Sequence, residues 1–96
     1  MPSQTPTPVL RRLLSGLMLP ALLTAVLGVL LALPQVVDVH HVHIWSLSTS
    51  QVAMTAHLCR RVGELDDMDL LHRAKDAVAA LGVEHCTLQL EPAPAG

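Results

Sequence analysis

The sequence predicts a small α+β domain, an open three-stranded sheet with two helices on one face, in the order helix, strand, strand, helix, strand. Two adjacent runs alternate apolar and polar residues with the period of a strand, and a third such run lies near the C-terminus. An uncharged segment precedes the first run, and a segment with apolar residues at helical spacing precedes the last. Because 96 residues allow one small core, we expect a single domain.

The N-terminal third divides into a polar lead and an apolar segment. Residues 1–12 are predicted to form a disordered lead, since the first eight residues combine three prolines with small polar residues. No charged residue occurs from Leu13 to Val37. We therefore predict an apolar helical segment over 13–34, which is long enough to span a bilayer.

Three hypotheses are open for this apolar segment. The first is a transmembrane helix, with Arg11 and Arg12 held on the cytoplasmic side. The second is a signal peptide, which is weaker because no small-x-small cleavage site precedes Gln35. The third is a helix that starts with Pro20 at its first position, extends from about Ala21 to Ala32 and packs on the sheet.

The two adjacent alternating runs predict a β-hairpin. Over 37–46, Val42 and Ile44 alternate with histidines and a tryptophan, and from Val52 to Leu58 every second residue suits a buried face. The polar sequence SLSTS at 46–50 between them is typical of a turn.

A second helix and a last strand follow. Three aspartates supply an N-cap and first-turn acids, and apolar residues then recur at helical spacing up to Gly82. The run 83–91 again alternates and predicts a strand. The predicted domain therefore covers 35–92, with 93–96 as a tail that contains proline and cannot continue a sheet.

Composition excludes several classes of function. A net charge of -2 with only six lysines and arginines offers no basic surface for nucleic acid, and Trp45 is the only aromatic residue that could stack on a base or sugar. Cys59 and Cys86 are far apart and form no CxxC pair, which argues against a disulfide scaffold and favours a reducing compartment. No nucleophile, base and orienting group can be combined, so we do not expect an enzyme.

The six histidines are the compositional feature with chemical content, because histidine is the commonest metal ligand. If the apolar residues of each strand face the helices, most of the histidines share the opposite face. That face would carry His41, His43, Trp45, His57, Cys59, His85, Gln89 and Glu91. A single histidine there is more often a solvated side chain, but the cluster favours a site for zinc or a similar ion. His72 flanks the apolar face of the second helix, and Cys59 is a ligand or an inert thiol.

The sequence from about Leu30 to Glu91 resembles the C-terminal cytosolic domain of cation diffusion facilitators, which are divalent-cation efflux transporters. The resemblance is most specific in HHVHIWSLS at 40–48, AHL at 56–58, LLHRA at 70–74 and HCTLQLE at 85–91. It implies a ferredoxin-like αββαβ fold, a homodimer, binding of zinc or another divalent ion, and a cytoplasmic location beneath a membrane-embedded transport domain. Residues 13–33 would then lie near the inner face of the membrane.

The resemblance also implies metal-binding positions at His40, His57 and His72, with an acidic residue at Glu91. Together with the exposed face of the strands, the predicted ligands are His40, His43, His57, His72, His85 and Glu91. The family pattern selects His40, whereas alternation places His41 and His43 on the exposed face. A bulge or a strand start near His40 would reconcile the two.

The chain departs from the family at three positions. Gln89 stands where some members have a further histidine, so that a second ion is lost or recruits His85 instead. Leu22 and Leu27 occupy places that are normally acidic and basic in the first helix, which predicts a helix that is buried, paired or in lipid.

The function that we predict is that of a dimeric, zinc-binding regulatory module of an efflux transporter, or of a stand-alone relative that lacks the transport domain. Two alternatives are a soluble metal buffer or chaperone, and a membrane-tethered dimerisation domain without a metal role. Imidazole and carboxylate ligands accept several transition metals, so zinc is the default choice.

Overall fold

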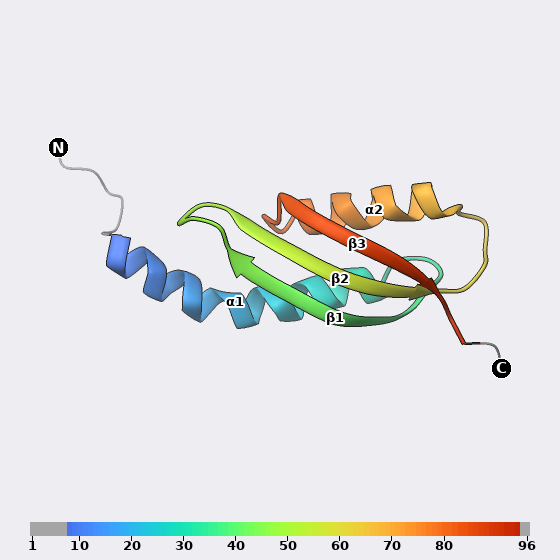
Figure 1. Cartoon of the computed structure of the whole chain (residues 1–96), viewed down its shortest axis with the longest axis horizontal. Helices are drawn as coiled ribbons and strands as arrows, with labels where there is room; N and C mark the ends of the chain where they lie inside the picture. The colour runs from blue at the N-terminus through green and yellow to red at the C-terminus, as the bar shows by residue number, and fades with distance from the viewer. Residues whose placement is uncertain (1–7, 95–96) are drawn as a thin grey trace.

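The computed structural model describes the backbone of residues 8–94 and the side chains of residues 19–94. The elements are α1 (Pro8–Leu31), β1 (Val36–Ser46), β2 (Val52–Arg60), α2 (Asp67–Ala79) and β3 (His85–Pro92). The central strand β2 pairs with β1 antiparallel and with β3 parallel. Parallel neighbours need a crossover connection, which α2 supplies. Both helices lie behind one face of the sheet, which confirms the predicted α+β fold (Figure 1).

The core lies between the two helices and the sheet. Each helix contributes side chains four residues apart, so that they stack on one face, and β2 contributes every second residue. The cluster consists of Val26, Leu30, Met54, Ala56, Leu58, Ala74, Val78 and Val83, none more than 1% exposed. All are aliphatic or methionine, as the near absence of aromatic residues requires. Within residues 8–94, no helix covers the opposite face of the sheet, which we call the open face (Figure 1).

Helix α1 differs from its prediction at its N-terminal end. It begins at Pro8, so residues 8–12 of the predicted disordered lead are helical, while residues 1–7 lie outside the described residues. Pro20 lies inside the helix and does not start it. Proline lacks the N–H of one helical hydrogen bond, but the leucine-rich sequence on both sides favours helix strongly enough to continue through it.

The C-terminal half of α1 packs on the sheet. Val26 and Leu30 join the core, and the N-terminal part of the helix projects past the end of the strands (Figure 1). The helix ends at Leu31, shortly before Pro34, which disfavours helical backbone at the residue before it. Among the residues that the structure describes, no helix combines the length and the apolar character needed to cross a bilayer.

A bulge interrupts β1 where the histidines lie. His40 pairs with His57 and His43 with Thr55, so that three steps along β1 correspond to two along β2. The extra residue, His41, has φ of 50°. Val39 and Val42, on either side of the bulge, both pack against the core. Of the two predicted ways to reconcile His40 with the alternation, the structure therefore has the bulge.

We expect His41→Val to lower the free energy of unfolding by about 1–3 kcal/mol, because a β-branched side chain fits a left-handed backbone poorly. His43→Val is the matched control, since His43 is also exposed on β1 but has no positive φ. It should change stability by no more than about 0.5 kcal/mol. Urea denaturation of the metal-free proteins measures both. Equal effects at the two positions would show that the bulge backbone does not constrain residue 41.

Candidate metal site

The candidate site lies on the open face of the sheet, near the start of β1 and the ends of β2 and β3. The register places side chains from all three strands in two neighbouring rows. In one row His40 lies opposite His57, and in the next Cys59 lies between Asp38 and Glu91. Adjacent strands are only about 4.8 Å apart, so long side chains in the same or neighbouring rows can meet.

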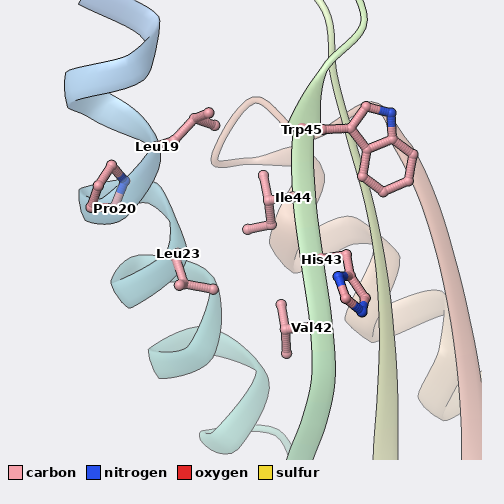
Figure 2. Close-up of a pocket in the computed structure, with 7 residues that line it drawn as sticks. All are labelled: Leu19, Pro20, Leu23, Val42, His43, Ile44 and Trp45. Atoms are coloured by element: carbon pink, nitrogen blue, oxygen red, sulfur yellow. The ribbon is translucent and has the colours of Figure 1, made fainter.

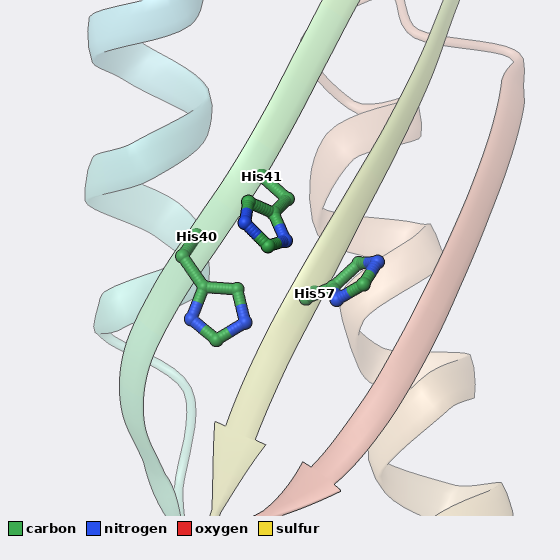
Figure 3. Close-up of side chains that lie close together, drawn as sticks. All are labelled: His40, His41 and His57. Atoms are coloured by element: carbon green, nitrogen blue, oxygen red, sulfur yellow. The ribbon is translucent and has the colours of Figure 1, made fainter.

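Three imidazoles converge on this face. One ring nitrogen from each of His40, His41 and His57 lies within 4.8 Å of the others. The ring centroids are 4.7 Å apart for His40 and His41, 4.9 Å for His41 and His57, and 5.4 Å for His40 and His57. Figure 3 shows the three rings gathered over β1 and β2. The bulge allows two consecutive residues, His40 and His41, to face the same side.

Glu91 on β3 holds two of these rings. Its Oε1 is 2.8 Å from His40 Nε2, and its Oε2 is 2.9 Å from His57 Nδ1. Burial alone would raise the pKa of Glu91, but hydrogen bonds from His57 and His40 outweigh it, and the pKa is lowered. Glu91 is therefore a carboxylate that accepts a hydrogen bond from each ring.

These hydrogen bonds have a consequence for metal binding. With the proton on the nitrogen that faces Glu91, His40 keeps the lone pair of Nδ1 and His57 keeps that of Nε2. A carboxylate that orients imidazoles in this way is the usual outer partner of metal-bound histidine, and it raises the basicity of the ligand. Glu91 thus fits the part of an orienting partner and also has oxygens that could bind an ion directly.

A second group of potential ligands overlaps the first. One ligand atom from each of Asp38, His40 and Cys59 lies within 4.8 Å of the others. Cys59 Sγ is 3.9 Å from His40 Nδ1 and 3.9 Å from Glu91 Oε1. Burial of the thiol raises the pKa of Cys59, and the negative charges of Glu91 and Asp38 raise it further.

Of the six predicted ligands, the structure brings His40, His57 and Glu91 together. His43 is on the open face one row away, opposite Thr55, beside the pocket between α1 and β1 in Figure 2. His85 pairs with Ala53, four residues from His57, or about 13 Å along the strand. His72 is exposed on α2, and no group of potential metal ligands among the described residues includes these three histidines.

Sequence reasoning missed three members of the two groups as ligands. Alternation places His41 on the exposed face without selecting it as a ligand, Cys59 is predicted as a ligand or an inert thiol, and Asp38 belongs to no predicted site. The pair HH at 40–41, in a run that otherwise alternates, is the signal that could have indicated a bulge. Nothing in the sequence gives the register that places Asp38 opposite Cys59.

Sequence comparison relates this chain to one domain of cation efflux proteins. Residues 19–93 match the family described as the cytoplasmic domain of cation efflux proteins. The metal cation efflux system protein CzcD of Cupriavidus metallidurans is 32% identical over 66 residues, which are 68% of this chain and 21% of that protein. The cation efflux system protein CzcD of Alcaligenes sp. gives the same values. The chain thus spans about a fifth of the length of these curated relatives, 21% of each.

Solved structures agree with this placement. The metal-bound C-terminal domain of the CzcD transporter from C. metallidurans superposes with a TM-score of 0.65 at 30% identity, over 72% of this chain and 96% of that one. A variant of the MamM C-terminal domain gives a TM-score of 0.70 at 12% identity, over 82% of this chain and 100% of that one, which supports the fold alone. The expected ferredoxin-like fold is confirmed. This chain belongs to the family of cation efflux protein cytoplasmic domains.

Proposed function

We propose that this chain binds a divalent cation, with zinc as the default, through His40, His41 and His57 on the open face of its sheet. The observation that carries the proposal is the convergence of the three ring nitrogens within 4.8 Å of one another. Imidazole nitrogens of this kind, with a water or a carboxylate as a fourth ligand, are what zinc accepts. The metal-bound state of the CzcD domain at 30% identity supports the same reading.

The residues present fit such an ion chemically and electrostatically. Glu91 would supply a negative charge beside the double positive charge, and it already orients the rings of His40 and His57. Since His40 belongs to β1 and His57 to β2, a bound ion would cross-link two strands. No catalytic role is needed for this function, and we propose a binding module and not an enzyme.

We further propose that ion binding favours a homodimer of this domain. The dimer would lie in the cytoplasm beneath a transport domain and regulate it. The site is on the face that the helices leave uncovered, where a second copy of the chain could dock. Trp45, also on β1, is 42% exposed and offers apolar surface for such a contact. An ion stabilises a closed dimer only if it binds that state more tightly than the open one. In this proposal α1, at the N-terminal end, leads from the membrane side to the sheet.

Titration with zinc by calorimetry, combined with sedimentation velocity, tests this function. We expect saturable binding and a dimer fraction that rises with zinc. Lowering the pH below about 6.5 should weaken binding, because imidazole must be neutral to bind a metal. Saturable binding to a monomer would favour a buffer or chaperone instead. A dimer that binds no zinc, and whose stability a chelator leaves unchanged, would indicate a dimerisation domain without a metal role.

A further inference from the structure

We infer that Cys59 gives this domain a second, thiolate-containing cation site, formed by Asp38, His40 and Cys59 and suited to thiophilic divalent cations such as Cd2+. The inference rests on the proposed metal-binding function and extends it to a different ligand set. It concerns which cations the domain prefers and which side chains hold them.

The three potential ligands of this second site lie close together. Asp38 and Cys59 are directly opposite each other in the pairing of β1 with β2, and His40 is two residues along from Asp38. His40 Nδ1 is 3.5 Å from Asp38 Oδ2 and 3.9 Å from Cys59 Sγ. Three different ligand types, a carboxylate, an imidazole and a thiol, therefore point to a common position on the open face.

The surroundings of Cys59 are not those of a cysteine that merely fills a core. Its side chain is on the open face of β2 and contacts His40 and Glu91. Cys86 provides the comparison within the same chain, because it packs against the hydrophobic cluster under the helices. Cys59 is the more buried of the two, 8% exposed, and Cys86 is partly buried. Cys86 packs as a small apolar residue, whereas the sulfur of Cys59 lies 3.9 Å from both His40 Nδ1 and Glu91 Oε1, which are groups that bind metals.

The two ligand sets share His40 and therefore compete. Its Nε2 faces Glu91, so Nδ1, which faces Asp38 and Cys59, is the nitrogen left for an ion. Soft thiolate ligands favour soft ions, whereas imidazole alone suits zinc, nickel and copper. A cation that takes Cys59 gains a sulfur electron pair while the thiol proton passes to water, and no oxidant or reductant is required. We therefore expect cadmium to bind His40 together with Asp38 and Cys59, and not together with His41 and His57.

Titration of the whole chain with Cd2+, followed by thiolate-to-cadmium charge-transfer absorption in the ultraviolet, tests this inference. We expect a saturable band in the wild type and in Cys86→Ala, the matched control. Cys59→Ser should abolish the band and lower the cadmium affinity at least about tenfold, in line with the loss of one metal partner. Its zinc affinity should fall by a smaller factor, since the three imidazoles remain.

The outcomes separate this inference from the function on which it rests. If zinc and cadmium both bind without a charge-transfer band, the sulfur site is wrong and the imidazole site stands. If neither ion binds, both proposals fail. Should Cys59→Ser not fold, cadmium NMR of the wild type replaces it. A resonance well downfield of that for nitrogen and oxygen ligands supports sulfur coordination, and its absence at saturation overturns the inference.

Discussion

Replacement of His40 by alanine is expected to lower the zinc affinity of this domain by at least about tenfold. Loss of an outer partner of a metal ligand typically costs about 10–100-fold in affinity, and loss of a ligand itself should cost no less. His40 belongs to both groups of potential ligands and is also held by Glu91. Isothermal titration calorimetry of His40→Ala and the wild type measures the change.

The matched control for this prediction is His85→Ala, because His85 is exposed on a strand of the same sheet but belongs to no ligand group among the described residues. We expect it to keep the wild-type affinity. His72→Ala tests whether a second copy of the chain contributes to the site. A loss of zinc affinity in this variant would mean that His72 on α2 of the second copy is a ligand. Wild-type affinity in His40→Ala together with a loss in His85→Ala would place the ion at the opposite end of the sheet.

Leu58→Ala is expected to lower the free energy of unfolding by about 2–5 kcal/mol, the range for removal of a large aliphatic side chain from a core. Leu58 is 0% exposed on the central strand, so the surrounding helices cannot fill the space that it leaves without moving. Small domains are stable by only about 5–15 kcal/mol, so the loss would be a large fraction of the total. Urea denaturation in the presence of a chelator gives the value.

Val62→Ala is the control for the core substitution. Val62 is 89% exposed in the connection after β2, and its truncation should change stability by no more than about 0.5 kcal/mol. Leu58 also stands between His57 and Cys59, whose side chains face the other side of β2. A loss in Leu58→Ala no larger than in Val62→Ala would contradict the packing of both helices on this strand.

Local signals in the sequence were sufficient for most of the fold. The aspartates before α2 predicted its start, and Asp66 indeed caps the helix by accepting a hydrogen bond from the Asp69 backbone N–H at 2.8 Å. Gly82, predicted to follow the helix, has φ of 95°, which glycine adopts without strain. The alternation along β2 and β3 correctly predicted which residues face the helices. It succeeded because these two strands pair without a bulge.

The parts that sequence did not predict depend on tertiary structure. Alternation fails at the bulge, since one extra residue moves His40 and His41 to the same side. The interior position of Pro20 reflects the preference of a whole apolar segment for helix over the penalty at one residue. Asp38 joins Cys59 only through the pairing of two strands, and no spacing along the chain encodes that pairing.

The most direct test of the central claim is a crystal structure of the domain grown with zinc, in which anomalous scattering locates the ion. We expect a peak bonded to the imidazole nitrogens of His40 and His57 at about 2.0–2.1 Å, with His41 as a further ligand. A peak on His72 or His85 without His40, or no peak at saturating zinc, would contradict the site.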